Sequence, residues 1–436
     1  MTVRYDDALP TLIRLADDNG VDLASDGVIV LRDARGRLGI VWRDREQASQ
    51  TLSADLKSKL GGYALPEPVI DSRLYDSIHA GDPKAIWVRK AEDGCWINLV
   101  DRRIVGADWL LEISEPNNSP PRLVFGSLKG GVGRSTALAV LAADLAARGK
   151  RVLCVDLDLE APGLSSMLLP RTDGDDRRPK YGALDYLVEN GLNRIEDEEL
   201  YDFIGVSPTA RGTIEVLPVV GRITDEHPEN MIGKLARGLI EDIQGDQRLS
   251  VAVQMREMVD RFAERLGSDV VLIDARAGLS EVTAGSWLAL GANKLLLFGI
   301  DQPQTYDGYR YVLAHLMQRL GAPSDDSSWD WRQILSFVQS KAPSSKESRA
   351  VFREQIHALC EDLLYEEAGG AELDRFSYDL SDPDVQAPHN ASYIAFHPDY
   401  LAFDPVRDAN QLSAEVYRGP FGGFLERMHF YLSKDR

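Results

Sequence analysis

The chain has 436 residues, of which 44% are hydrophobic and 27% charged, a composition typical of a folded protein that excludes a mainly disordered chain. At about 150 residues per domain, this length predicts two or three domains. Acidic residues outnumber basic ones by 69 to 49, and the resulting net charge of −20 disfavours nucleic acids and anionic membranes as partners.

The cysteines and the N-terminus indicate the compartment. Cys95, Cys154 and Cys360 lie far apart without any C-x-x-C pair, so neither a disulfide framework nor a zinc cage is predicted. The first ten residues contain acidic side chains and a proline where a secretory signal has positive charge followed by an apolar stretch. The most apolar runs, such as residues 294–300, are far shorter than the roughly 20 residues of a membrane-spanning helix. We therefore expect a cytoplasmic protein.

The first part of the chain alternates short β-like runs with turn signals. Residues 27–33 and 38–44 flank the turn ARGR, and residues 85–90 and 95–100 flank the turn AEDG. Both patterns predict β-hairpins, because each pairs two apolar runs across a short polar turn.

Residues 1–113 are accordingly expected to form a small accessory α+β domain. Their balance of charge is acidic, so nothing marks them as a DNA-binding domain, and we expect them to meet an unidentified protein partner. Residues 114–121 (SEPNNSPP) predict a linker, because two adjacent prolines continue neither a helix nor a central strand. The remaining domain is expected to span residues 122–436.

From residue 122 onwards, apolar β-like runs alternate with helix-like segments. A strand at residues 122–125, a glycine-rich turn, a helix ending near Gly149 and a strand at residues 151–158 form a βαβ unit. Further apolar runs follow at residues 213–220, 269–275, 294–300 and 333–339, and a helix is expected over residues 249–266. This alternation predicts an α/β fold with a mostly parallel, doubly wound sheet. Exposed loops are expected at residues 171–180 and 322–330.

The glycine-rich turn has the composition of a phosphate-binding loop. It reads Lys129, Gly130, Gly131, Val132, Gly133, Arg134, Ser135 and Thr136. Closely spaced glycines let successive backbone N–H groups surround an anion, and the helix that follows adds its positive N-terminal end. The general pattern G-x-x-x-x-G-K-[ST] is not matched strictly, since Leu128 replaces its first glycine and Arg134 its lysine.

This turn resembles the deviant Walker A motif of the ParA/MinD superfamily, K-G-G-V-G-K-[ST], and especially a bacterial subgroup with arginine in the loop. The resemblance implies a P-loop ATPase in which ATP and Mg²⁺ are bound by Lys129 through Thr136. It makes Lys129 the signature lysine, Arg134 the phosphate-binding cation and the Ser135 hydroxyl a ligand of Mg²⁺.

Three aspartates follow β-like runs in the order found in that superfamily. In DLDLEAPGL, the resemblance places Asp158 beside the metal and the attacking water, and gives Asp156 a supporting role at the nucleotide. In DVVLIDARAG, Asp274 matches the Walker B carboxylate that reaches Mg²⁺. Each aspartate has an alternative role as the cap of a turn, and for Asp156 the two roles are evenly balanced.

Four further features carry weaker signals. Arg276 is expected to pair with a nearby acid rather than with nucleotide. Residues 302–309 match a turn that lines the dimer face in relatives. Lys341 and Pro343 match residues beside the adenine, although an ordinary surface loop is equally consistent with them. In FGGFLERMHFYL, residues 421–432, apolar side chains share one helical face that we expect to pack on the body rather than on a membrane.

The resemblance implies a slow Mg²⁺-dependent ATPase whose ATP-bound homodimer regulates or positions a partner, with Lys129 and Asp158 as the catalytic pair. The alternative is a nucleotide-gated interaction module with little or no hydrolysis, by family analogy part of a multi-gene bacterial defence system. A DNA-partitioning ATPase is disfavoured by the acidic charge.

Overall fold

The computed structural model describes residues 3–25, 27–42, 50–71, 85–89, 96–116, 120–172, 175–190, 192, 195–208, 212–244, 247–321, 329–366 and 376–433. The chain divides into two compact units, here called the smaller unit (Met1–Leu111 with Ala314–Gly321) and the larger unit (Glu112–Leu313 with Ala322–Arg436). The accessory role of residues 1–113 and the linker at 114–121 remain predictions. Cys95, the turn AEDG and residues 322–328 lie outside the described residues.

The smaller unit contains a five-stranded mixed sheet in the order β3-β2-β1-β5-β4. Its strands are β1 (Val28–Arg32), β2 (Leu38–Trp42), β3 (Ala64–Asp71), β4 (Ala85–Arg89) and β5 (Trp96–Asp101). Antiparallel pairing of β1 with β2 and of β4 with β5 confirms both predicted hairpin pairings, and β1 joins β5 in parallel.

Two helices supply the core of the smaller unit, α1 (Tyr5–Asp18) and α2 (Gln50–Leu60), and short 3-10 turns lie at Gly61–Tyr63 and Asp108–Leu110. Leu12 of α1 and Leu52 and Leu56 of α2 are fully buried in one apolar cluster with Val30 and Ile40 of the sheet. The unit is therefore α+β, with its helices packed on the sheet.

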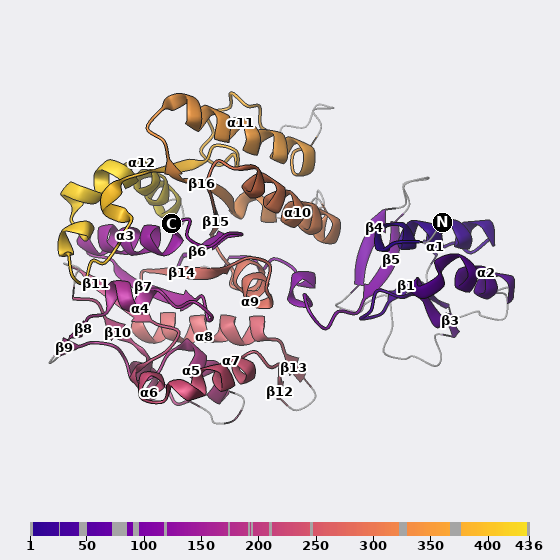
Figure 1. Cartoon of the computed structure of the whole chain (residues 1–436), viewed down its shortest axis with the longest axis horizontal. Coiled ribbons are helices and arrows are strands. Elements are labelled where there is room, and N and C mark those ends of the chain that lie inside the picture. The colour runs from indigo at the N-terminus through magenta and orange to yellow at the C-terminus, as the bar shows by residue number, and fades with distance from the viewer. Residues whose placement is uncertain are drawn as a thin grey trace. The chain divides into compact units, whose positions relative to one another are not determined.

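The larger unit is built around an eight-stranded sheet in the order β10-β11-β7-β14-β6-β15-β16-β17 (Figure 1). The strands are β6 (Arg122–Ser127), β7 (Arg151–Leu157), β10 (Gly205–Val206), β11 (Thr213–Leu217), β14 (Val270–Ala277), β15 (Lys294–Gly299), β16 (Leu335–Ala342) and β17 (Ser392–Ala395). Every neighbouring pair is parallel except β10 with β11. The predicted mostly parallel α/β sheet is confirmed.

Two short ribbons accompany this sheet. They are β8 (Arg171–Thr172) with β9 (Asp175–Asp176) and β12 (Asp242–Gln244) with β13 (Gln247–Leu249). The segment 171–180 was expected to be a loop. It contains the first ribbon, whose two-residue strands pair with each other and not with the main sheet.

The helices of the larger unit are α3 (Arg134–Ala147), α4 (Leu164–Leu168), α5 (Ala183–Asn190), α6 (Arg222–Glu226), α7 (Met231–Gly238), α8 (Val251–Leu266), α9 (Glu281–Ala284), α11 (Lys346–Leu363) and α12 (Ala414–Ser433). A further helix, α10 (Pro303–Leu320), belongs to the larger unit up to Leu313 and to the smaller unit from Ala314. Short 3-10 turns lie at Glu199–Phe203, Pro228–Asn230, Trp331–Ile334, Pro398–Tyr400 and Ala409–Leu412, and a π-helical turn at Gly285–Ala289. Among the described residues, no helix has the length and apolar character needed to cross a membrane.

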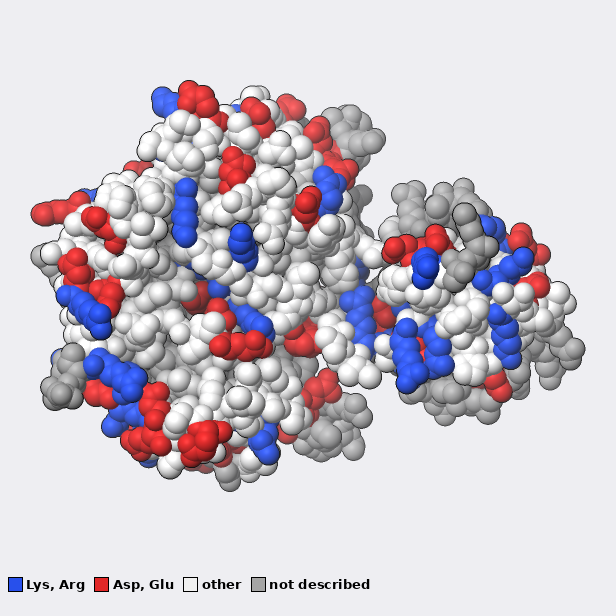
Figure 2. Space-filling model, in the orientation of Figure 1, with Lys and Arg blue, Asp and Glu red and all other residues white. Residues whose placement is uncertain are grey.

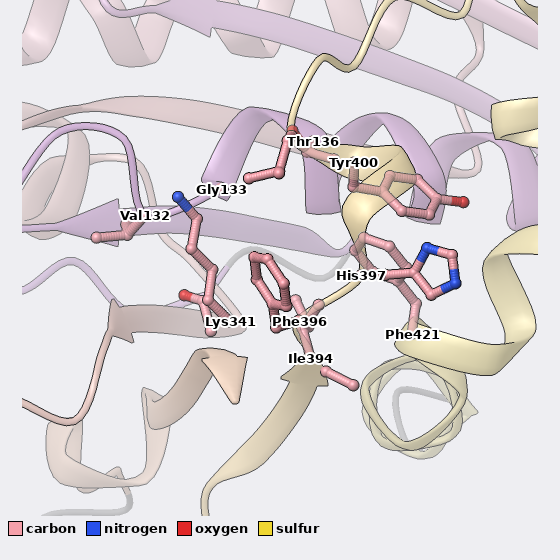
Figure 3. A pocket seen from close by; sticks show the side chains of 12 residues that line it. Val132, Gly133, Thr136, Lys341, Ile394, Phe396, His397, Tyr400 and Phe421 are labelled. Carbon is pink, nitrogen blue, oxygen red and sulfur yellow. The ribbon is translucent and has the colours of Figure 1, made fainter. Parts of the chain in front are cut away.

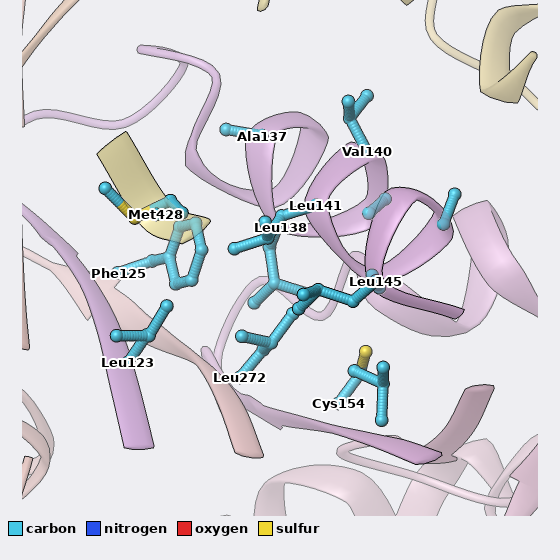
Figure 4. Packing of buried hydrophobic residues seen from close by; sticks show 14 of the residues in the cluster. Leu123, Phe125, Ala137, Leu138, Val140, Leu141, Leu145, Cys154, Leu272 and Met428 are labelled. Atoms are coloured by element: carbon cyan, nitrogen blue, oxygen red, sulfur yellow. The ribbon is translucent and has the colours of Figure 1, made fainter. Parts of the chain in front are cut away.

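The two faces of the sheet are distinguished at neighbouring residues of β6. Phe125 packs among α3 and α12 side chains, with Leu138 and Met428 nearby (Figure 4). Gly126 faces Trp287, and a Cβ there would lie only 2.7 Å from the indole, so this position requires glycine. Both faces are covered by helical segments, as the prediction of a doubly wound sheet requires.

The C-terminal helix α12 packs on the body of the larger unit, as expected. Phe424, Leu425, Met428 and Tyr431 are buried in the same apolar cluster as α3. Phe424 contacts Phe125 edge-on, with the ring centroids 6.3 Å apart. The apolar face predicted at residues 421–432 is therefore buried in this core.

Candidate functional site

The glycine loop joins the end of β6 to the start of α3. Gly131 and Gly133 have φ angles of 73° and 87°, in the left-handed region that favours glycine. A Cβ at Gly130, Gly131 or Gly133 would meet no protein atom within 4 Å, so the loop borders open space. A backbone of this shape, followed by a helix N-terminus, suits an anionic ligand.

Arg134 begins α3, and its side chain is only 6% exposed. Its Nη1 donates to the carbonyl oxygen of Ala275, and its Nη2 donates to Oδ2 of Asp158 over 3.2 Å. The guanidinium thus joins β14 to the residue after β7. The resemblance predicts that Arg134 binds phosphate. In this structure both of its terminal nitrogens donate hydrogen bonds to protein oxygens instead.

The side chains of Ser135, in the first turn of α3, and Asp274, in β14, contact each other. The Ser135 hydroxyl donates to Oδ2 of Asp274, which is 1% exposed. The Oδ1 atom of Asp274 is buried and has no hydrogen-bond partner among the described residues. Burial raises the pKa of Asp274, and the charge of Arg134 and the bond from Ser135 offset this only in part. A buried carboxylate with an unsatisfied oxygen beside a hydroxyl is suited to a divalent cation.

No group of three or more His, Cys, Asp or Glu side chains that could hold a metal occurs in the described part of the chain. Proteins usually bind Mg²⁺ through one or two carboxylates together with water and the substrate's phosphates. The donor set of Ser135 and Asp274 therefore fits Mg²⁺ that arrives with a nucleotide.

Asp156 lies opposite Asp274 on the adjacent strand and is fully buried. Its Oδ1 accepts from the Asp158 amide at 3.1 Å, and its Oδ2 accepts from the amides of Gly163 and Leu164, both at 3.0 Å. Burial raises its pKa, and the neighbouring Asp274 charge raises it further. The side chain thus has the capping contacts of the alternative role and holds the loop after β7 in place.

Asp158 faces the loop from the end of β7. Burial raises its pKa, whereas the charge and hydrogen bond of Arg134 lower it, and the upward effect prevails. Arg276 forms an ion pair with Glu160 in the same loop, which is the pairing with an acid that the sequence led us to expect.

Lys129, the expected signature lysine, is exposed, and within the described residues its side chain forms no hydrogen bond or ion pair. A cavity of about 450 Å³ beside it is lined also by Leu279, Gln304 and Tyr311. Gln304 belongs to the segment 302–309 that was expected near a dimer face, and Tyr311 is 65% exposed.

A second, smaller pocket of about 50 Å³ also borders the loop (Figure 3). Its walls are the loop and α3, the end of β16, and the segment from β17 to α12, contributed by Val132, Gly133, Thr136, Ser340, Lys341, Ile394, Ala395, Phe396, His397, Tyr400, Leu401 and Phe421. Lys341 lies in this wall, but Pro343 does not. Sequence reasoning missed the aromatic residues Phe396, Tyr400 and Phe421, which carry no motif and converge only through the fold.

The motif-bearing part of the sheet matches a known domain family. Residues 123–275 match the CobQ/CobB/MinD/ParA nucleotide binding domain, a range that contains the glycine loop and all three aspartates. Over these residues, the larger unit is similar to the nucleotide-binding domains of this ParA/MinD-like family. The resemblance is thereby confirmed for the family, while the arginine-bearing subgroup remains a prediction.

Three solved structures to which the chain is similar are a ParA, a MinD and a chain of a MinC:MinD complex. The pNOB8 ParA structure is 19% identical, with a TM-score of 0.45, over 73% of this chain and 100% of that chain. The cell division ATPase MinD of Pyrococcus furiosus is 20% identical, with a TM-score of 0.42, over 72% and 99%. A chain of the MinC:MinD cell division protein complex of Aquifex aeolicus is 16% identical, with a TM-score of 0.42, over 72% of this chain and 97% of that chain. No curated protein matches the sequence.

Proposed function

We propose that the larger unit binds ATP with Mg²⁺, hydrolyses it slowly, and uses the nucleotide state to control a homodimer that regulates or positions a partner. The observation that carries this proposal is the Ser135–Asp274 pair beside the open glycine loop, in which one buried Asp274 oxygen has no partner within the part of the chain that the structure describes. A hydroxyl, a carboxylate and a glycine-rich helix N-terminus together suit a metal-bound triphosphate.

The loop amides from Gly130 to Ser135 would hold the phosphates, and Ser135 and Asp274 would hold Mg²⁺. Bound Mg²⁺ would neutralise charge on the phosphate oxygens. Asp158 orients a water for in-line attack on the γ-phosphate, which yields ADP and phosphate. Lys129, exposed and unpaired in the described chain, is positioned to stabilise the developing charge in its own site or across a dimer.

The pocket beside Lys341 and Phe396 is the proposed site of the base (Figure 3). Its lining combines aromatic and aliphatic side chains, which suit the flat face of a purine.

One observation favours the alternative, a nucleotide-gated module with little hydrolysis. Asp158, the residue proposed to orient water, is held by Arg134. If that pair persists with nucleotide bound, Oδ2 of Asp158 is occupied and the carboxylate is held towards Arg134, which would slow hydrolysis and leave ATP mainly as a ligand. In either case we propose that residues 1–113 meet the protein partner.

DNA is not a proposed partner. On the face shown in Figure 2, basic and acidic side chains of the larger unit are interspersed, without a continuous basic area among the described residues. Such a surface offers little of the phosphate neutralisation on which DNA affinity depends.

Titration calorimetry with ATP and Mg²⁺ tests nucleotide binding. Gly131→Val should abolish measurable binding, because valine strains a backbone with φ of 73° and places a side chain in the open cradle. Gly149→Val is the matched control: Gly149 has φ of 84° at the far end of α3, also with open space at its Cβ. Equal affinity in the two variants would remove the glycine loop from the binding site.

A further inference from the structure

Lys341 has an unusual backbone. It is the one non-glycine residue with a positive φ, 50°, among the described residues. The pairing of β16 with β17 shifts its register between Gln339 and Ala342, so Lys341 lies in an irregularity at the end of the strand. Non-glycine residues in this conformation are uncommon, and the cost is tolerated mainly where surrounding contacts fix the residue for a purpose.

The side chain of Lys341 reaches the glycine loop. Its Nζ donates to the carbonyl oxygen of Gly131 over 2.7 Å, between residues 210 positions apart in the chain. Figure 3 shows the side chain extending from the end of β16 towards Val132 and Gly133. A loop whose amides surround an anion turns carbonyls outward, and a charged donor on one of them favours that orientation of the peptide.

The other cations near the loop do not have this role. Arg134 is occupied by Asp158 and the Ala275 carbonyl, and the Lys129 side chain forms no bond with the described chain. Lys341 also lines the proposed base pocket beside Phe396, which is 49% exposed. One residue therefore contacts both the loop and the pocket.

We infer that Lys341 is a positioning residue that holds the glycine loop in its phosphate-binding shape and links the loop to the base pocket. This rests on the proposed nucleotide site and adds a loop contact to it. Because the contact is with the loop itself, its loss affects any ligand that carries a polyphosphate, with or without a base.

The test compares ATP with inorganic tripolyphosphate, each with Mg²⁺, by titration calorimetry on the full chain. Lys341→Met should weaken both ligands by about tenfold, the effect of one lost charge-assisted hydrogen bond. Lys341→Arg, which keeps a donor, should retain most of the affinity. Lys346→Met is the control, because it removes an equal charge from an exposed position five residues further along the chain.

Lys341→Gly separates the amine from the backbone. Glycine adopts a φ of 50° without strain, so the melting temperature of this variant should equal or exceed that of the native protein. Because the amine is missing, the variant should still bind both ligands weakly. Unchanged affinities in Lys341→Met, or a loss confined to ATP, would overturn the loop contact while leaving the nucleotide site standing. If the native chain binds neither probe, the proposed function fails and this inference with it.

Discussion

Arg134 shows how one residue type can alter a phosphate-binding loop. A guanidinium has several donors in a fixed plane, and here two of them serve Ala275 and Asp158 at once. A lysine ammonium is a single compact charge that can reach phosphate but cannot bridge these two acceptors in the same way. The arginine thus connects the loop helix to the residue proposed to orient water.

Arg134→Lys is expected to raise hydrolysis while ATP affinity stays within about tenfold, or roughly 1.4 kcal/mol. The physical reason is that lysine frees Asp158 to orient water and restores a compact charge at the phosphates. Single-turnover phosphate release and calorimetry measure the two effects, with Arg148→Lys at the exposed end of α3 as the control. A slower Arg134→Lys enzyme would show that the guanidinium itself assists the reaction.

Arg134→Ala should cost stability as well as function. It removes the ion pair with Asp158, which is partly buried, and the expected loss is about 1 to 3 kcal/mol, between the values for exposed and buried pairs. Chemical denaturation measures the loss, and Arg134→Lys, which keeps a charge, should lose less. Equal stability of Arg134→Ala and the native protein would mean that the pair contributes nothing to the fold.

At the scale of elements, the buried carboxylate of Asp144 in α3 forms hydrogen bonds with side chains of the C-terminal helix α12. Asp144 accepts from the Tyr417 hydroxyl at 3.0 Å, lies 2.6 Å from His429 Nε2 and pairs with Arg148 at 3.0 Å. Burial would raise its pKa, but hydrogen bonds from His429 and Tyr417 and the charge of Arg148 lower it to about 2. Asp144 thus favours its ionised form in the folded state.

This lowered pKa predicts how stability depends on pH. Because the folded pKa lies below the ordinary value of 3.8, the contribution is fully present above pH 3.8 and is lost as the pH falls towards 2. A shift of this size corresponds to about 2 kcal/mol. Denaturation of native protein and Asp144→Asn between pH 2.5 and 7 should show the two stabilities converging at low pH. A constant difference would contradict the ionised pair.

The sequence predicted the strand-end motifs because they are local. Asp274 follows four apolar residues, and the glycine loop lies between a strand and a helix. Each apolar run marks a strand, so the residues that follow it are expected at the carboxyl edge of the sheet. The Asp144–His429 contact joins residues 285 positions apart and leaves no local signal. The pocket residues Phe396 and Tyr400 were missed for the same reason, and the orientation of Arg134 depends on acceptors that only the fold brings near.

At the scale of the whole molecule, the exposed Lys129 and the cavity beside it bear on the proposed dimer. Tyr311 and Leu279 of that cavity are 65% and 56% exposed, so apolar surface lies next to an unpaired cation. If γ-phosphate joins two such faces, dimerisation depends on ATP and is reversed by hydrolysis.

Light scattering coupled to gel filtration checks this dependence. ATP with Mg²⁺ should convert monomer to dimer, Asp158→Ala should keep the dimer longer because the γ-phosphate persists, and Lys129→Ala should prevent it. Lys150→Ala, just after α3, is the control. A mass that does not change with nucleotide would argue against the switch.

The most direct test of the central claim is phosphate release from ATP by the purified native chain in the presence of Mg²⁺. We predict slow release that disappears in Asp158→Ala and in Asp274→Ala, and that persists in a control variant of the exposed Asp379, Asp379→Ala. Tight ATP binding with no release above the Asp158→Ala and Asp274→Ala variants would contradict the ATPase and leave the nucleotide-gated module as the function of this site.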